Sequence, residues 1–179
     1  TWLTGKKFWP ETILCAATLL RTSDIPLRLH FVDDGTLDRE AIAAIERVLP
    51  GTRFTLKPEI EARMNRVLPK KRFRKLRFTR TFYPHIKKLI DVHAGTTEDW
   101  KVVLDSDMLF WHRPGRFLDW VQDPRKPLLL VDVKTAYGYP DALLEELAGG
   151  PLPPKVNVGI TGLHTGELDW EQLEYWIAT

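Results

Sequence analysis

The sequence predicts an α/β domain in which helices flank a mostly parallel sheet. Short apolar runs alternate along the chain with longer amphipathic stretches, which is the pattern of successive strand–helix–strand units. The length of 179 residues suits one domain, and a hydrophobic content of 44% can supply its core. Because the chain shows neither an internal repeat nor a low-complexity linker, we expect one domain over residues 1–179.

Local signals define the elements of the first half. Pro10 stands where the first turn of a helix tolerates proline. An alternating run that becomes apolar stops at the turn signal Asp33-Asp34-Gly35, and a later amphipathic stretch stops at Pro50-Gly51. We therefore expect helices over 8–21 and 37–49 and strands over 27–32 and 53–56.

The second half follows the same alternation. The apolar run Val102-Val103-Leu104 ends on Asp105, which predicts a buried strand with an acidic residue at its end. In chain order we expect a helix over 77–92 interrupted near Pro84, a strand over 101–104, a helix over 114–121, a buried strand over 128–133, a short apolar segment over 156–163 and a helix over 169–178.

The single cysteine, Cys15, excludes an internal disulfide, and its apolar neighbours predict a buried thiol rather than a catalytic one. No run approaches the roughly 18 apolar residues of a membrane span, and no secretory leader is visible. We therefore expect a cytoplasmic protein. Because the chain starts at Thr1 and stops inside an expected helix, we also expect it to be truncated at one or both ends.

Acidic residues follow two of the expected strands. Asp33-Asp34 and the pair Asp105 and Asp107 each come just past the C-terminal end of a strand. In open parallel sheets ligands bind in the crevice outside these strand ends. We therefore expect both acidic clusters to face one cleft.

The segment Asp105-Ser106-Asp107 lies between two apolar runs. Carboxylates buried there without a partner would cost several kcal/mol, so a cation is the expected partner. Oxygen ligands suit Mg²⁺ or Mn²⁺, and such an ion commonly keeps coordination positions open for phosphate oxygens. The alternative is a solvated turn between a strand and a helix, because Asp-x-Asp alone is a frequent tripeptide.

These residues carry a resemblance to a known family. The segment 101–110 resembles the strand and Asp-x-Asp motif of the GT-A glycosyltransferases, especially the glycogenin-like and galactosyltransferase-like enzymes of family 8. Three further segments resemble elements of the family and occur in the family's order. Thr4-Gly5 resembles its first nucleotide-contacting loop, and Val32–Gly35 resembles the loop after its second strand. Val156–Gly159 resembles its Asn-x-Gly segment. The resemblance implies a GT-A-type, Rossmann-like fold. It also implies transfer of a hexosyl group from a nucleoside diphosphate sugar, UDP-sugar favoured, to the hydroxyl of a saccharide, lipid-linked or protein acceptor.

The resemblance also assigns roles to single positions. Asp105 would contact the ribose, the metal or both, and Asp107 would coordinate the Mn²⁺ or Mg²⁺ that bridges the donor diphosphate. Asn157 would hydrogen-bond a sugar hydroxyl, and Gly159 would let the backbone approach the ligand. The remaining positions expected at the donor are Thr4, Gly5, Asp33 or Asp34, and Lys75 or Arg77.

One element of the family is missing from this sequence. We find no C-terminal His-x-x-Gly-x-x-Lys, which in relatives supplies a metal-binding histidine and a phosphate-binding lysine. His164 is a candidate substitute, although a lone histidine is more often structural. An inverting enzyme would also need a carboxylate base beside the acceptor, for which Glu167 and Asp169 are candidates unless they only begin a surface helix.

Residues 62–90 contain eleven Lys or Arg and no acidic residue. One interpretation is a clamp for the leaving diphosphate, in which Lys75 or Arg77 matters more than Lys87 or Lys88. A second is a solvated basic face, and a third is peripheral contact with anionic lipid headgroups or a lipid-diphosphate acceptor. Interleaved aromatics also suit single-stranded RNA. We do not favour RNA, because the net charge is only +2 and the sequence contains no recognised RNA-binding module.

Three other functions compete with the transferase. Residues 33–37 look like a haloacid-dehalogenase phosphatase motif, but Val32 occupies the position of its nucleophilic aspartate, so no aspartyl-phosphate can form. A sugar-phosphate nucleotidyltransferase usually has a glycine-rich first loop, whereas residues 3–7 contain one glycine. A catalytically inactive GT-A domain that binds a sugar nucleotide or a protein partner is the non-enzymatic alternative.

Overall fold

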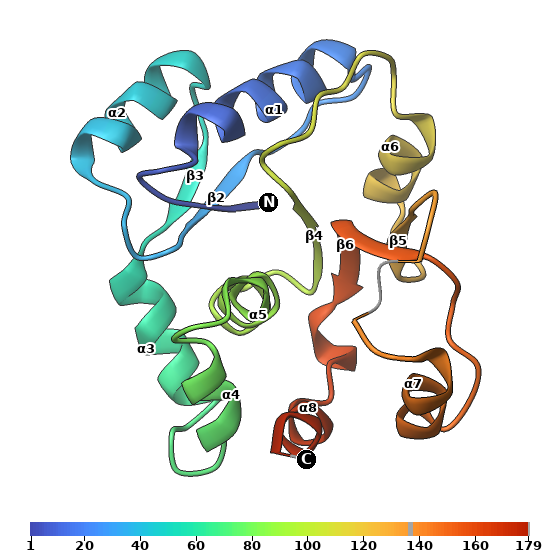
Figure 1. Ribbon diagram of the computed structural model, residues 1–179. Coiled ribbons are helices and arrows are strands. Elements are labelled where there is room, and N and C mark those ends of the chain that lie inside the picture. The colour runs from blue at the N-terminus through green and yellow to red at the C-terminus, as the bar shows by residue number, and fades with distance from the viewer. Residues whose placement is uncertain (136–137, 179) are drawn as a thin grey trace.

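Two three-stranded sheets lie side by side at the centre of the molecule (Figure 1). The computed structural model describes residues 1–135 and 138–178. The first sheet is parallel, in the order β1-β2-β3, and the second is antiparallel, in the order β4-β6-β5. The backbone N–H of Leu104 donates to Thr1 O at 3.0 Å and so joins β4 to β1. The strands are β1 (Trp2–Thr4), β2 (His30–Asp33), β3 (Arg53–Thr55), β4 (Trp100–Leu104), β5 (Leu128–Val131) and β6 (Val156–His164).

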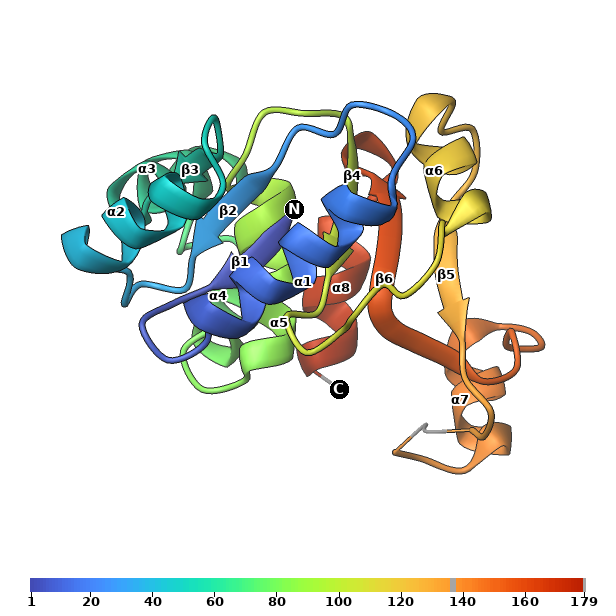
Figure 2. The same cartoon turned by 90° about the horizontal axis from the view of Figure 1, so that it is seen from above.

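Helices pack on both sides of the parallel sheet, with α1 and α2 on one side and α3, α4 and α5 on the other (Figures 1 and 2). A π-helical turn, Ile90–Ala94, continues α5 towards β4, and a 3₁₀ turn, Thr165–Glu167, follows β6. Within the described chain, none of the helices combines the length and apolar character needed to cross a bilayer. The helices are α1 (Trp9–Thr22), α2 (Arg39–Val48), α3 (Lys57–Val67), α4 (Arg74–Thr79), α5 (Pro84–Leu89), α6 (Gly115–Gln122), α7 (Asp141–Ala148) and α8 (Trp170–Ala178).

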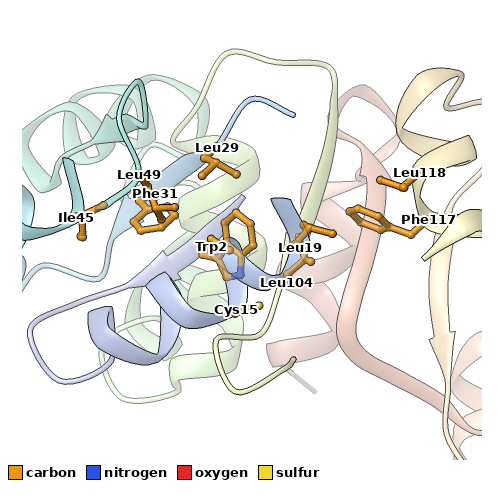
Figure 3. Close-up of a cluster of buried hydrophobic side chains, with 11 residues drawn as sticks. Trp2, Cys15, Leu19, Leu29, Phe31, Ile45, Leu49, Leu104, Phe117 and Leu118 are labelled. Atoms are coloured by element: carbon orange, nitrogen blue, oxygen red, sulfur yellow. The ribbon is translucent and has the colours of Figure 1, made fainter. Parts of the chain in front are cut away.

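Two hydrophobic cores cover the two faces of the strands. Alternation along β2 sends Phe31 into the first core and Val32 into the second. In the first core, Trp2 and Phe31 meet edge to face with ring centroids 5.6 Å apart, among side chains of α1, α2 and α6 (Figure 3). The second core joins α3, α4 and the π-helical turn to Val103 of β4. β2 and β4 each contribute buried side chains to both cores, which holds the loops at the ends of these strands in place.

The α/β class is confirmed, and most expected elements lie within a few residues of their expected bounds. The parallel strands are confined to the first half of the chain, because the antiparallel strand β6 separates β4 from β5. The expected strand 27–32 begins only at His30, since its neighbours begin pairing at Trp2 and Arg53. The sequence analysis did not predict β1, α3 or α7.

The expectation of a buried strand over 128–133 is wrong. β5 pairs on one edge only, with β6, and Leu129, Leu130 and Val131 are exposed. An apolar run identifies a strand but does not show what covers it.

Candidate functional site

A pocket of about 530 Å³ lies between the end of β1, the end of β4 and helix α5. It brings Asp34, which follows β2, together with Asp105 and Asp107, which follow β4. The two acidic clusters thus face one cleft. The lining residues are Leu3, Thr4, Phe8, Glu11, Asp34, Pro84, His85, Lys87, Lys88, Leu104, Asp105, Ser106 and Asp107.

The two carboxylates of the Asp-x-Asp segment have different surroundings. Asp105 is half-buried, and its carboxylate forms an ion pair with the ammonium of Lys88. Its backbone N–H donates to Gly159 O at 2.8 Å, which ties this loop to β6. Asp107 is exposed, and its carboxylate has no hydrogen-bond or ion-pair partner among residues 1–135 and 138–178. Asp107 is therefore the carboxylate that is free to take a ligand.

A chain of hydroxyl groups joins the Asp-x-Asp loop to the loop after β1. The Thr12 Oγ1 on α1 lies 2.8 Å from Thr4 Oγ1 and 2.8 Å from Ser106 Oγ. Beneath it, the Cys15 Sγ lies 3.5 Å from Asp105 O, and burial raises the pKa of this thiol. Cys15 is fully buried, as its apolar neighbours predict, so it supports the loop rather than reacting with a ligand.

Asp33 and Asp34 have different roles: Asp33 is structural, and Asp34 lines the pocket. The buried carboxylate of Asp33 accepts hydrogen bonds from the backbone N–H groups of Gly35 at 2.7 Å, Leu37 at 2.9 Å and Lys57 at 3.2 Å. These three bonds hold Asp33 within its own loop, and Asp33 is not among the residues that line the pocket. Asp34 lines the pocket, although its Oδ1 also accepts from the N–H and the hydroxyl of Thr36.

Gly5 lies against the carboxylate of Asp34. A Cβ built on Gly5 would lie 2.0 Å from Asp34 Oδ1, which only glycine avoids. The neighbouring Lys6 N–H donates to Thr36 Oγ1 at 2.9 Å. The loops after β1 and β2 therefore pack as one unit at the floor of the pocket.

Two lysines of α5 supply the positive charge of the pocket. Lys88 pairs with Asp105, and the Lys87 Nζ donates to Asp34 O at 2.9 Å. Helix α5 starts at Pro84, whose fixed φ suits a first helical position. In the sequence, the signal for these lysines is their place just after Pro84, in the segment that precedes the strand ending at Asp105.

Lys75 and Arg77, which the sequence analysis favoured as the diphosphate clamp, lie elsewhere. Both line a separate hollow beside α4 and α8. The Arg77 side chain is only 7% exposed, and its Nη2 lies 3.2 Å from Glu61 Oε2 in an ion pair. It also donates to Asn65 Oδ1 at 3.1 Å. Arg77 is thus part of the packing between α3 and α4, and the expectation for this pair needs correction.

Asn157 uses its side-chain amide within its own sheet. Its Nδ2 donates to Asp132 Oδ2 at 2.9 Å, and its Oδ1 accepts from the Gly159 N–H at 2.6 Å. The bond from Asn157 lowers the pKa of Asp132. Asn157 is not among the residues that line the pocket, whereas Gly159 lies beside Asp105, because a Cβ on it would be 3.7 Å from Asp105 Oδ2.

His164, Glu167 and Asp169 lie beyond the opposite end of β6 from the pocket. His164 pairs with Trp100 at the start of β4, while Ile160 pairs with Leu104 at its end. Ile160 and His164 are four residues apart along β6, which corresponds to roughly 13 Å. Asp169 accepts a hydrogen bond from the Gln172 N–H at 2.9 Å at the start of α8. His164, Glu167 and Asp169 are therefore not among the residues that line this pocket, and its geometry does not support them as a metal ligand or a base there.

The metal-binding potential of the site rests on two carboxylates. Across the part of the chain that the structure describes, no group of three or more His, Cys, Asp or Glu side chains is arranged to hold a metal ion. A cation at Asp105 and Asp107 would consequently need further oxygen ligands from a substrate or from water.

Comparisons with known proteins identify the fold. No protein-family model matches the chain, and no curated protein matches it by sequence. Among solved structures, it is similar to the galactosyltransferase LgtC in complex with donor and acceptor sugar analogues, with a TM-score of 0.58 and 16% identity over 97% of this chain and 58% of LgtC. It is similar to mouse xyloside xylosyltransferase 1 in its apo form, with a TM-score of 0.62 and 13% identity over 99% of this chain and 70% of that one. A third match, the bifunctional glycosyltransferase WbbM, has a TM-score of 0.53 and 13% identity over 99% of this chain and 32% of WbbM.

These similarities show that the chain has the GT-A fold of glycosyltransferases. The chain spans 58% of the length of LgtC, so the matched region is only part of that enzyme. At these identities the likeness concerns the fold, and activity has to be argued from the site.

Proposed function

We propose that the chain is the nucleotide-sugar-binding part of a glycosyltransferase. It would move a hexosyl group from a nucleoside diphosphate sugar, with UDP-sugar favoured, to an acceptor hydroxyl. The observation that carries this proposal is the meeting of Asp105, Asp107, Lys87 and Lys88 in one pocket outside the ends of β1, β2 and β4. Ligands of open α/β sheets bind at this edge. The GT-A fold of the chain adds support.

The residues present fit a divalent cation that arrives with the donor. Mg²⁺ is commonly held by one or two carboxylates together with substrate phosphates, and carboxylate oxygens suit Mn²⁺ equally. Asp107 offers an unpartnered carboxylate, and Asp105 lines the same pocket. When bound, the cation would neutralise charge on the leaving diphosphate.

The chain's own cations perform a related task. The ammonium groups of Lys87 and Lys88 line the pocket and would stabilise the negative charge that builds on the departing diphosphate. Lys88 is held by Asp105 and Lys87 by the carbonyl of Asp34, so both groups are positioned before a ligand binds. Thr4 and Asp34 line the adjoining part of the pocket, where the nucleoside end of the donor would bind, and Gly5 packs against Asp34.

A panel of nucleotide sugars tests the proposal directly. Thermal unfolding would be measured with each sugar nucleotide, with and without Mn²⁺, followed by assay of nucleoside diphosphate release in the presence of saccharide acceptors. A ligand at 100 times its Kd stabilises the folded state by about 2.7 kcal/mol, which is a measurable rise in Tm. We expect a UDP-hexose to give this rise with Mn²⁺. If no nucleotide sugar stabilises the protein under either condition, the proposal is wrong.

A second candidate is a GT-A domain that binds a sugar nucleotide without transferring the sugar. The pairing of Asp105 with Lys88 and the lack of a three-ligand metal cluster among the described residues favour it. Stabilisation by a UDP-sugar without any release of UDP, across acceptors, would select this candidate. Pyrophosphate release from a nucleoside triphosphate and a sugar phosphate would instead select the nucleotidyltransferase.

A further inference from the structure

Exposed cations and aromatic rings gather around α4, and none of them lines the donor pocket. Helix α4 lies with α8 at one end of the molecule, and α1, α2 and α6 lie at the other (Figure 1). We call the following exposed side chains the α4 patch: Lys70, Lys71, Arg74, Lys75, Phe78 and Phe82. Four of them, namely Lys70, Arg74, Lys75 and Phe78, line the hollow beside α4 and α8.

The cations of the α4 patch are not neutralised by the chain. Lys70, Lys71, Arg74 and Lys75 have no ion-pair partner among residues 1–135 and 138–178. Two nearby acidic residues pair with cations outside the patch, and Glu174 binds backbone N–H groups at the start of α4. Glu61 pairs with Arg77 and Arg80, Glu171 pairs with Arg72, and the Glu174 carboxylate accepts from the backbone N–H groups of Lys75 and Leu76 at 2.7 Å each. The patch therefore presents four positive charges beside the single carboxylate of Glu174 and remains net positive.

Apolar rings stand beside these charges. Phe78 is 66% exposed and Phe82 is 63% exposed, and their rings meet edge to face with centroids 5.3 Å apart. Two large apolar side chains that remain in water cost free energy unless something covers them. A cationic surface with exposed Phe side chains is the combination by which proteins bind the interface of an anionic bilayer.

We propose that the α4 patch docks the protein on the surface of an anionic lipid membrane. The lysines and arginine would lie among the negative headgroups, and Phe78 and Phe82 would enter the headgroup–acyl boundary. A small soluble anion would leave the two rings without a role. Single-stranded RNA would need open ring faces for base stacking, whereas the edge-to-face contact covers one face of this pair.

The position of the patch relates it to the donor pocket. Phe82 is separated only by Tyr83 from Pro84 and His85, which line that pocket. A membrane bound at α4 would therefore lie close to the pocket entrance. The docking itself does not depend on transferase activity, so it can be tested even if the proposed function is wrong.

The experiment compares sedimentation of the protein with vesicles of phosphatidylcholine alone and of phosphatidylcholine mixed with phosphatidylserine. One variant replaces the four patch cations, Lys70, Lys71, Arg74 and Lys75, with Gln, and another carries Phe78→Ser and Phe82→Ser. The matched control replaces four exposed cations at the other end of the molecule with Gln, namely Arg21, Arg39, Arg47 and Lys126. Circular dichroism and thermal unfolding check that every variant is folded.

We expect the parent protein to bind only the anionic vesicles and to be released by salt. A cation near such a surface contributes about fivefold in affinity, so the four-Gln patch variant should bind at least about 100-fold more weakly, and the control should bind with a much smaller loss. The Phe variant should bind the anionic vesicles more weakly than the parent at the same salt concentration, because it lacks the two rings that would enter the headgroup–acyl boundary. Failure of the parent to bind anionic vesicles would overturn the proposal. Equal losses in patch and control variants, or patch-dependent binding of oligouridylate RNA without vesicle binding, would also overturn it.

Discussion

The ammonium of Lys88 on α5 forms an ion pair with the carboxylate of Asp105, the first residue after β4. This contact connects the Asp-x-Asp segment to the helix that precedes its strand. In the absence of a ligand, Lys88 compensates the charge of Asp105. A bound diphosphate offers the same ammonium a second anionic partner within the pocket, so the pair prepares the site for a phosphate group.

Lys88→Met should weaken UDP binding by about tenfold or more, because a hydrogen bond to a charged group contributes roughly 1.5–3 kcal/mol. Lys75→Met is the matched control, since Lys75 lines the separate hollow beside α4. Isothermal titration calorimetry of both variants with UDP checks the prediction. Equal affinities would show that the pocket lysine acts only through the general charge of the surface.

Asp107→Asn should remove the metal dependence of UDP binding. In the parent protein we expect Mn²⁺ to raise the affinity for UDP by about tenfold or more, equivalent to about 1.4 kcal/mol. Asn keeps the size of the side chain but loses the charge that attracts the cation. Asp141→Asn, at an exposed position on α7, controls for net charge. Calorimetry with Mn²⁺ and with a chelator measures the difference, and a parent that binds UDP equally in both would rule out a metal at Asp107.

Periodicity and capping signals predicted most of the fold. The amphipathic pattern located α2, whose N-terminus is capped by Asp38 accepting from the Ala41 N–H. The interruption expected near Pro84 is where α5 begins. The sequence analysis did not predict β1, because three residues carry no period. It also missed α3, because only Ile60 and Met64 of that helix are buried. Short or mostly solvated elements depend on contacts with residues distant in the sequence. The local sequence gives no information about these contacts.

The sequence could predict the acidic residues of the candidate site but not its basic residues. A carboxylate at the end of a strand has its place determined by sheet topology, so Asp34 and Asp105 could be expected in one cleft. The cations of residues 62–90 are spread over α3, α4, α5 and the turns between these helices, and the directions of the helices depend on those turns. Charge spacing alone therefore could not distinguish Lys88, at the pocket, from Arg77, which is buried against Glu61.

Gly5→Ala should disturb the floor of the pocket. The new Cβ would overlap the Asp34 carboxylate, which Thr36 holds in place, so the loop after β1 or the loop after β2 must move. We expect UDP affinity to fall by about tenfold, together with a lower Tm, because displaced groups at a binding site lose more than one contact. Gly150→Ala, where a Cβ meets open space, should change neither quantity. An unchanged affinity in Gly5→Ala would exclude this loop from the nucleotide site.

Stability should fall as the pH drops from 7 to 5. Burial lowers the pKa of His30 to about 4 and that of His93 to about 3, whereas unfolded histidine titrates near 6.5. The folded state therefore binds fewer protons than the unfolded state below pH 6.5, and its stability is lost as the pH falls towards the folded pKa. Each histidine should lower the free energy of unfolding by about 2 kcal/mol between pH 7 and pH 5.

Urea unfolding at pH 7 and pH 5 measures this loss. His93→Gln, which keeps polar atoms near the Thr165 hydroxyl 3.1 Å away, should remove about half of the loss due to the two histidines. His85→Gln, at an exposed position on the rim of the pocket, should leave the pH dependence unchanged. A parent protein that is equally stable at both pH values would show that the two buried histidines are protonated in the folded state.

The last prediction concerns Asn157, for which the resemblance and the structure indicate different roles. The resemblance implies a hydrogen bond to a sugar hydroxyl, whereas the structure commits the amide to Asp132 and to the Gly159 N–H. An amide has two donors and two acceptor sites, so these bonds leave one N–H and one lone pair unused. The Gly159 segment in turn accepts the Asp105 N–H, so loss of the amide should loosen the loop beside Asp105.

Asn157→Ala should therefore lower the free energy of unfolding by about 1 kcal/mol or more, the usual cost of a lost hydrogen bond. The affinities for UDP and for the intact UDP-sugar should fall by the same factor, since the substitution acts through the loop and not through the sugar. A double-mutant cycle with Asp132→Ala should be non-additive in stability, because the two side chains share one bond. Selective weakening of the UDP-sugar, with UDP affinity and stability unchanged, would instead assign the free part of the amide to the sugar.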